Sequence, residues 1–581
     1  MDKLPITNSH VHIFTRDHVP PFIAKTFVFW PFYYLLHLGA ITWMVKVWYK
    51  FRNGQLYNAK STYNQIKDFY RKAASVGLLK LLFGAFTALL FVNVVLICFN
   101  WLASFGVDGN IKKKVDETIE FLDGYYMFIA HGALQILAVV FVVLVFPDLR
   151  RLLLTILKIP FKFLSFIPGK MVSHLLERYM LLGKFALHKD QGGIYTKLNR
   201  QYPDATKFIV LPMDMEQMGA GKVKKDYNAQ LDELIAIKSK DKQNVFKPFV
   251  FVDPRRIKVS TDFFSWSQGK PGEVVPDPNC RIFDCIVNHH FSGFKIYPAL
   301  GYYPFDEALL PLWKYAADNQ LPIMTHTIRG TIYYRGKKQE NWFHHPVFKQ
   351  SKGDGEVKSL ELNEKKNIDF TVNFTHPMNY LCLLSEPLLR ILVGKSSTSI
   401  QQLFGYNGAG QPMDFDLSHL KVCLAHHGGE EEWVKYLEKD RYYYAQQLIQ
   451  HRHRGLEFFS GNDLTSTDWN RLYNYWSYVD WYSIISSLML QYENVYSDIS
   501  YILSKPRILP LLNETLDEHL NPALRKKVLY GTDFYVVRNH FSEKDLLAQM
   551  RCGLREADFD QIARENPKDY LSNNIAGHEG Y

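Results

Sequence analysis

The sequence predicts an α/β protein, a (β/α)8 TIM barrel that carries an α-helical transmembrane insertion after its first strand. Two observations lead to this fold class. From about residue 183 onward, short apolar runs alternate with helix-like stretches, which is typical of parallel strands joined by helices. Before that point, three apolar segments each approach or exceed the roughly 20 residues that a helix needs to cross a bilayer. The length of 581 residues accommodates both parts, because a (β/α)8 barrel takes about 250 residues.

These patterns divide the chain into three expected segments. Residues 1–20 supply the first barrel strand and a His-x-His motif. Residues 21–175 form a membrane-embedded helical insertion, and residues 176–581 form the remainder of the barrel.

The first predicted strand runs from Leu4 to Ser9 and leads into His10-Val11-His12. Later apolar runs, each bounded by polar or turn-forming residues, predict buried strands. There are seven of them: Lys207 to Met213, Pro248 to Asp253, Gly293 to Tyr297, Leu321 to Thr325, Leu420 to Ala425, Asn494 to Asp498 and Lys527 to Gly531. Together with the first strand they make eight, the number of strands in a closed barrel.

Helices are expected between these strands. The clearest candidates are Asp306 to Asn319, Glu431 to His451 and Tyr475 to Tyr492. The stretch from Gln339 to Asp369 is polar, and we expect it to be an excursion after the fifth strand.

The insertion contains three strongly apolar segments, Phe22 to Trp48, Val76 to Trp101 and Tyr125 to Phe146. A weaker segment from Leu152 to Ile167 is interrupted by two lysines and a proline. Because all strands of one barrel lie on the same side of a membrane, the insertion must cross an even number of times. Three spans are therefore excluded.

Charge indicates which segments cross. Six basic residues and one acidic residue lie between the first and second segments, from Lys50 to Lys72, and such positive loops stay cytoplasmic. We expect the second and third segments to form a transmembrane hairpin, and the first segment, with Pro31 and Lys46, to be re-entrant or interfacial. Two alternatives remain, namely four spans that include Leu152 to Ile167, and buried core helices of a soluble domain. The favoured interpretation is a multi-pass membrane protein with its barrel on the cytoplasmic side.

Charge and cysteine content limit the partners. The net charge of +10 arises from basic residues that often stand beside hydrophobic runs, which favours contact with anionic lipid headgroups over binding of nucleic acid. No cleavable signal peptide is visible. The cysteines are scattered, so we expect reduced, mostly buried thiols and a cytosol-facing barrel. They are Cys98, Cys280, Cys285, Cys382, Cys423 and Cys552.

Candidate metal ligands stand where predicted strands end. His10 and His12 alternate with Val11, so both imidazoles point to the same side of a strand. Along the chain, His326 follows the fifth predicted strand, His426 follows the sixth and Asp533 follows the eighth. Strand ends of a (β/α)8 barrel converge on one site, and imidazoles with a carboxylate suit a catalytic divalent metal, with zinc as the favoured ion.

A His-x-His motif can arise by chance in this chain, because it has 21 histidines and a single motif of this kind is a weak signal of a metal site. Histidines also pair elsewhere, and we assign those pairs no role. They are His289 with His290, and His344 with His345. The order of ligands along the strands is what favours a metal site.

The pattern resembles the amidohydrolase superfamily, in particular its amidohydrolase-related group of metal-dependent hydrolases and decarboxylases. The resemblance covers residues 1 to about 15 and about 200 to 575, and it is specific in combination. Its further motifs are Val252-Asp-Pro-Arg255, Gly293-Phe-Lys-Ile-Tyr-Pro298, Leu321-Pro-Ile-Met-Thr-His326, Leu424-Ala-His-His-Gly-Gly429 and Tyr530-Gly-Thr-Asp533.

The resemblance implies that His10, His12, His326 and Asp533 hold the metal and that Asp533 is the general base. It places His426 near the substrate or a second metal, as a catalytic residue. The family usually has an aspartate shortly before the His-x-His motif, whereas Asn8 and Ser9 stand there in this chain. The family's members are mostly soluble, so nothing in it corresponds to the insertion at residues 22–170.

Three more residues have open roles. In some superfamily members a lysine on the fourth strand is carboxylated and bridges two metals, and Lys295 stands on that strand here. The alternative is that Lys295 has a structural role or contacts the substrate, and we favour this alternative. Asp214 and Glu216 follow the second strand and either shape the pocket or lie at the surface.

The expected function is metal-assisted hydrolysis of a carbonyl, amide or ester substrate. A non-oxidative decarboxylase with the same metal ligands is the first alternative, and a non-catalytic membrane scaffold is the second. The insertion begins directly after His12, and this loop lies on the catalytic face of a barrel. An amphiphilic, lipid-like substrate could therefore enter from the headgroup layer; the alternative is that the insertion is only an anchor and the substrate is a soluble small molecule.

Overall fold

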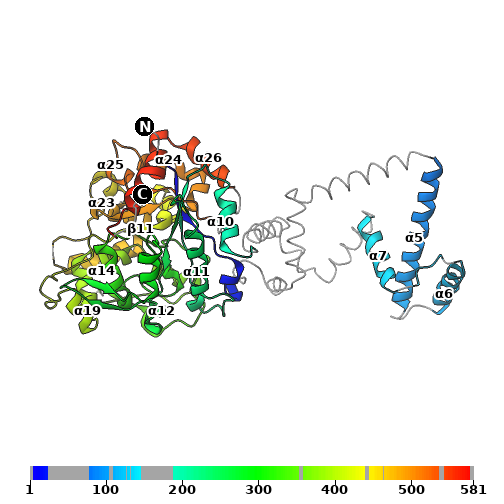
Figure 1. The fold of residues 1–581 in the computed structure, drawn as a ribbon, viewed down its shortest axis with the longest axis horizontal. Coiled ribbons are helices and arrows are strands. Elements are labelled where there is room, and N and C mark those ends of the chain that lie inside the picture. The colour runs from blue at the N-terminus through cyan, green and yellow to red at the C-terminus, as the bar shows by residue number, and fades with distance from the viewer. Residues whose placement is uncertain are drawn as a thin grey trace. The chain divides into compact units, whose positions relative to one another are not determined.

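The computed structural model describes residues 4–23, 77–103, 109–125, 127–130, 132–145, 188–351, 357–438, 444–461, 463–534 and 542–575. The chain divides into two compact units, one made of Met1–Tyr34 with Arg178–Tyr581 and the other of Leu35–Glu177. The larger unit is a mixed α/β structure with its strands among helices, and the described part of the smaller unit is helical (Figure 1).

Parallel strands form the centre of the larger unit. One sheet contains β1 (Thr7–Val11), β2 (Lys207–Val210) and β3 (Phe246–Pro248) in that order. The other contains, in chain order, β4 (Val250–Phe251), β7 (Phe294–Lys295), β8 (Ile323–Met324), β11 (Val422–Leu424), β12 (Val495–Asp498) and β13 (Val528–Leu529). Every residue of these strands is buried, as expected for parallel strands covered on both faces.

Backbone hydrogen bonds connect the two sheets at both ends. β3 runs into β4, and the chain changes partner there, because Phe249 N–H donates to Val210 while Val250 N–H donates to Gly293. At the other end, Ser9 N–H donates to Tyr530 O at 2.8 Å, next to β13. Neighbouring strands are therefore bonded in the order β1, β2, β3–β4, β7, β8, β11, β12, β13, and back to β1.

Alternate strand residues lie in two different apolar clusters. A small cluster contains one residue from each of several strands, together with C-terminal residues; its members include Ile209, Met324, Cys423, Leu529, Tyr570 and Leu571. Their strand neighbours belong to the large cluster that also contains the helices; they include Phe208, Ile323, Val422 and Val528. The two-residue period of a strand thus separates an inner face from a helix-covered face.

All eight predicted strands coincide with observed strands, although most observed strands are shorter. Apolar sequence continues past the last ladder hydrogen bond because the following residues are also buried, as Leu211 and Met213 are after β2. β1 instead begins later than predicted and extends to Val11, so His10 lies on the strand itself.

The helix predictions need one correction. The expected helix from Tyr475 to Tyr492 is wrong as one helix, since the chain forms α22 (Ser466–Tyr478) and α23 (Trp481–Gln491). Asp480 separates them, because its side chain caps α23 by accepting a hydrogen bond from Ser483 N–H at 2.7 Å.

Other helix predictions agree more closely. The stretch from Asp306 to Asn319 contains α14 (Leu310–Asp318) after a short 3-10 turn. The stretch from Glu431 to His451 contains α20 (Glu430–Glu438) and α21 (Tyr444–Gln450); residues 439–443 lie outside the described parts.

Two antiparallel hairpins were not predicted. The polar excursion after the fifth strand contains β9 (His344–Ser351) paired with β10 (Val357–Glu361). A second hairpin pairs β5 (Trp266–Gln268) with β6 (Val274–Pro276). β5 and β6 have three residues each, too few for a clear alternation, and most of β10 is exposed. β9 does contain buried residues, such as Val347 and Phe348, but they stand within a polar stretch.

The smaller unit contains three described helices: α5 (Gly77–Ala103), α6 (Gly109–Gly124) and α7 (Gly132–Val145). Among the described residues, α5 is the one helix long and apolar enough to cross a membrane, over Gly84–Trp101. The first apolar segment beyond Ile23, the basic loop after it and the weak fourth segment lie outside the described residues.

The third apolar segment is not one helix from Tyr125 onward. Residues 127–130 are non-helical and are held by the buried side chain of Asn93 on α5, which donates to Met127 O and accepts from Ile129 N–H, both at 2.9 Å. The described helix α7 has 14 residues, about 21 Å at 1.5 Å per residue. This length is less than the hydrocarbon thickness of about 30 Å.

The prediction of mostly buried cysteines agrees with the structure. All six cysteines are free, and Cys280, Cys285, Cys382 and Cys423 are buried. Cys98 is half-buried and Cys552 is exposed.

Candidate metal centre

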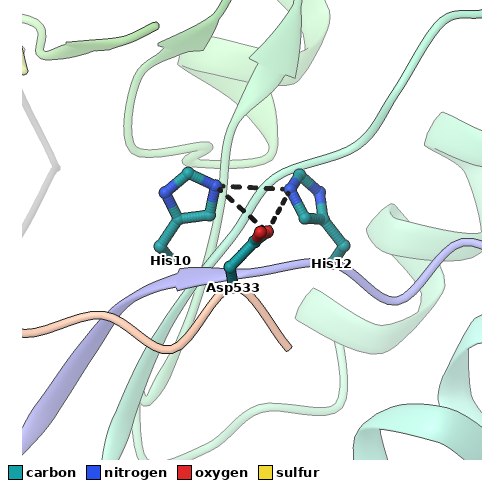
Figure 2. A group of neighbouring side chains, drawn as sticks. All are labelled: His10, His12 and Asp533. Carbon is teal, nitrogen blue, oxygen red and sulfur yellow. Dashed lines mark hydrogen bonds and ion pairs between the residues drawn. The ribbon is translucent and has the colours of Figure 1, made fainter. Parts of the chain in front are cut away.

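Three predicted ligands meet at the end of β1 (Figure 2). The Nε2 atoms of His10 and His12 lie 3.3 Å apart. Asp533, from the segment after β13, places Oδ1 at 3.3 Å from His12 Nε2 and 3.7 Å from His10 Nε2. Both imidazoles share one face of β1, and the backbone N–H of Asp533 donates to His10 O at 2.8 Å, which brings the carboxylate beside them.

These distances fit a bound divalent ion. A tetrahedral ion with bonds of about 2.0–2.1 Å sets its ligand atoms about 3.3 Å apart.

The outer nitrogens of both imidazoles are occupied. His10 Nδ1 lies 2.8 Å from Asp498 Oδ2, and His12 Nδ1 lies 2.7 Å from Leu211 O. Because neither partner oxygen can donate, each Nδ1 carries the proton and each Nε2 presents a lone pair. Two lone pairs that face each other and a carboxylate repel unless a cation lies between them, which is the arrangement typical of metal-bound histidines.

Asp498 is a site residue that the sequence interpretation missed. It ends β12 and is fully buried, and its Oδ1 accepts hydrogen bonds from the backbone N–H groups of His426 at 3.0 Å and Ser500 at 2.9 Å. Burial opposes its ionisation, but the charge and hydrogen bond of His10 outweigh this and lower the pKa of Asp498. The sequence did contain a signal for this residue, because Asp498 stands at the end of a predicted strand.

His326 and His426 adjoin this cluster. His326 Nδ1 lies 3.0 Å from His426 Nε2, and His426 Nδ1 lies 2.9 Å from Ser500 Oγ. If His426 donates from Nδ1, then His326 donates from Nδ1 and its Nε2 presents a lone pair. This buried Nε2 has no hydrogen-bond partner in the part of the chain that the structure describes. His326 thus joins the cluster through His426, and not by direct contact with His10, His12 or Asp533.

Burial dominates the titration of the site. It lowers the pKa of His10 to about 3 and lowers those of His326 and His426. Burial opposes ionisation of Asp533, but interactions with His12, His10 and His426 lower its pKa. The site therefore favours neutral imidazoles beside an ionised carboxylate, which are the ligand states that a metal ion needs.

Strained backbone is concentrated at the same place. Asp533 has φ +54°, His426 +67°, His427 +43° and Tyr501 +68°. Side chains other than glycine rarely adopt this left-handed region, and each such residue costs about 1–3 kcal/mol. The surrounding contacts hold these conformations, and strain of this kind is commonest at functional sites.

Lys295 lies on β7 inside the strand region and is fully buried. Its Nζ donates to Thr325 O at 3.1 Å. Burial lowers the pKa of Lys295 to about 8. The described contact is structural, in line with the favoured alternative.

Asp214 and Glu216 both form ion pairs with Arg256. Arg256 Nε donates to Asp214 Oδ2 at 2.6 Å, and Arg256 Nη2 lies 3.1 Å from Glu216 Oε1. His345, one of the paired histidines, is buried with both ring nitrogens bonded, to Asn379 Oδ1 and to backbone N–H groups. These residues stabilise loops and do not belong to the metal cluster.

Gly531 is packed against His10. A Cβ at this position would lie 2.8 Å from His10 Cβ and 3.1 Å from His10 N. We expect Gly531→Ala to lower the free energy of unfolding by about 1–3 kcal/mol through overpacking, and to reduce metal content because His10 must move. Thermal unfolding and metal analysis measure both effects. Gly410→Ala is the control, since a Cβ there meets nothing within 4 Å; equal metal content in the two variants would contradict the expectation.

No family model and no curated protein match this chain. Among solved structures, it is similar to a 2,6-dihydroxybenzoate decarboxylase complexed with 2,6-dihydroxybenzoate, at 11% sequence identity and a TM-score of 0.33, over 70% of this chain and 93% of the other. It is also similar to an amidohydrolase from Mycobacterium avium subsp. paratuberculosis K-10, at 14% identity and a TM-score of 0.28, over 66% of this chain and 74% of the other. These similarities assign no family, so the amidohydrolase resemblance stays a prediction.

Proposed function

We propose that this chain is a metal-dependent enzyme with a (β/α)8 barrel, a hydrolase that acts on a carbonyl, amide or ester substrate. One observation carries the proposal. The Nε2 lone pairs of His10 and His12 converge on Asp533 while Asp498 and Leu211 hold the opposite nitrogens. A cation between these atoms would offset the repulsion between the lone pairs and the carboxylate.

His10, His12 and Asp533 would hold the ion, and His326, with its unpartnered Nε2, is the proposed fourth ligand. The mixed nitrogen and oxygen donors suit zinc among the divalent ions. A bound divalent ion supplies Lewis acidity and lowers the pKa of a coordinated water toward neutrality.

Side chains of the protein itself would carry out the other parts of the reaction. Asp533 is ionised, and its carboxylate can take a proton from water as the general base. His426 is held by Ser500 Oγ at Nδ1 and by Asp498 at its backbone N–H. We propose that the fixed His426 ring lies beside the substrate and orients it. Burial of all these groups excludes bulk water and strengthens each electrostatic contact.

The function is tested on purified full-length protein by metal analysis and a substrate panel of amides, esters and carboxylates, with and without chelator. Stoichiometric metal and chelator-sensitive cleavage of an amide or ester support the hydrolase. Release of carbon dioxide from a carboxylate, without cleavage of the others, favours the decarboxylase alternative. If the protein binds no divalent metal stoichiometrically, the catalytic proposal is overturned and the non-catalytic membrane scaffold is the remaining interpretation.

We further propose that the insertion anchors the enzyme in a membrane, with the barrel on the cytoplasmic side. The apolar window of α5 is only 24% buried, and large side chains such as Phe86 are exposed (63%), which suits a lipid environment better than a protein core. Just before the insertion, Phe22 N–H donates to Ala220 O at 3.1 Å, in the loop after β2. We propose that an amphiphilic substrate enters from the headgroup layer.

Topology is tested by cysteine labelling in intact cells. We expect a cysteine at position 110, at the start of α6, to react from outside, and one at position 61, in the basic loop, to react only after the cells are opened. Labelling of position 61 from outside would contradict the hairpin and favour four spans. A hydrolysable amphiphile that is turned over equally fast in vesicles and as monomer would count against lateral entry.

A further inference from the structure

Arg335 presents a guanidinium edge without an acceptor. It stands nine positions after His326, in the loop that follows β8. Its Nε and Nη2 are buried, and neither has a hydrogen-bond partner among the residues that the structure describes. These two nitrogens form the side of a guanidinium that binds two oxygens at once.

Neighbouring arginines show how this edge is normally used. Arg255 donates from Nε and Nη2 to the two oxygens of Asp253, at 2.9 and 2.6 Å. Arg329, six positions before Arg335, donates from the same two nitrogens to Asp369, at 3.0 and 2.6 Å. Arg335 is the exception among these three, because the matching edge has no described carboxylate.

The loop around Arg335 is rigidly held. Arg335 N–H donates to Met218 O at 2.7 Å, and Asn367 Nδ2 donates to the carbonyls on either side, Tyr334 O at 3.1 Å and Gly336 O at 2.9 Å. Gly219 has φ +72°, and a Cβ there would lie 2.6 Å from Gly336 N, so the loops after β2 and β8 approach too closely for any side chain. The backbone of Arg335 is thereby fixed, which lowers the entropy lost when its side chain binds a ligand.

The Arg335 guanidinium lies over the Tyr333 ring, with Cζ 4.7 Å from the centroid. The ring covers one face of the guanidinium and leaves the edge for an anion. Buried N–H groups without acceptors are unfavourable, whereas a two-oxygen anion satisfies both of them.

We propose that Arg335 binds a two-oxygen anion, a carboxylate or a phosphate, through its Nε and Nη2 edge. The loops after β2 and β8 lie at the strand ends that also carry His12 and His326. We therefore assign the anion to the substrate, a step that rests on the proposed function, so that this enzyme would act on anionic small molecules or lipids.

The test measures anion binding directly, with the full-length protein in detergent at low ionic strength. Sodium benzoate and inorganic phosphate are titrated separately by calorimetry, which distinguishes a carboxylate site from a phosphate site. Saturable binding of one or both is expected. Arg335→Gln should weaken it about tenfold or more, because a charge-assisted bidentate pair is lost, and Arg335→Lys should weaken it several-fold, since the charge remains.

Arg329→Gln is the matched control, because Arg329 belongs to the same loop but already has a carboxylate partner and is half exposed. We expect its binding within about twofold of wild type. If Arg335→Gln does not fold, Arg335→Lys serves as the test variant. Its melting temperature and metal content must then match those of the wild type. Absence of saturable binding to wild type, or unchanged binding in both Arg335 variants, would overturn the proposal.

Chelation separates this proposal from the metal chemistry. Binding at Arg335 should persist within about twofold in chelated protein and in His12→Ala. Binding that disappears with the metal but survives in Arg335→Gln would identify the anion as a metal ligand and overturn the proposal. Failure to find metal or turnover, with Arg335-dependent binding intact, would overturn the proposed function alone.

Discussion

Replacing His12 by alanine is expected to abolish stoichiometric metal binding and metal-dependent activity. His12 supplies one of the Nε2 atoms that face Asp533, at 3.3 Å. Changes to groups that merely orient a ligand cost about 10–100-fold in metal affinity, so loss of the ligand itself should exceed about 100-fold. Metal content by elemental analysis and chelator titration of the purified variant measure the effect.

The same loss is expected for alanine at His10, His326 or Asp533, whereas His426→Ala should lower activity with less loss of metal. His344→Ala is the control, because this exposed histidine stands on β9 and belongs to neither group of potential ligands. A His12→Ala protein with wild-type metal content would refute the assigned centre, whatever its activity.

Replacement of Asp498 should give the second large effect. Its carboxylate accepts hydrogen bonds from His10 and from the backbone N–H groups of His426 and Ser500, all of them buried. Asp498→Ala leaves these donors without acceptors, so we expect the free energy of unfolding to fall by about 3–5 kcal/mol. Metal affinity should fall about 10–100-fold as well, because the proton on His10 Nδ1 is no longer fixed. Denaturant unfolding and metal titration measure the two quantities.

Asp498→Asn and Asp468→Asn separate stability from metal affinity. The asparagine at 498 keeps the shape but faces donors with its own NH2 group, so metal affinity should drop with a smaller stability loss of about 1–3 kcal/mol. Asp468 is equally buried and accepts hydrogen bonds from Ser460 and Thr465, at the start of α22. Asp468→Asn should destabilise the fold without changing metal affinity. Equal metal loss in both variants would mean that Asp498 acts only through stability.

Sequence patterns alone predicted the strands and the candidate ligands at their ends. Apolar runs marked all eight strands because parallel strands are buried on both faces and exclude polar side chains. The spacing of His10 and His12 placed both imidazoles on one face, since side chains of a strand alternate. Asp533 could be grouped with them because its predicted strand ends at the same edge as theirs.

Tertiary structure alone decided how these groups are supported. Asp498 lies 488 positions from His10 along the chain, and Leu211 is 199 positions from His12. No local pattern connects them, because a hydrogen bond between strands depends on how distant segments pack. The same holds for the break between α22 and α23 at Asp480. There a capping side chain ends the run of apolar residues that predicted one continuous helix. It holds also for the free edge of Arg335, since an acceptor's absence becomes visible only when every neighbouring side chain is in place.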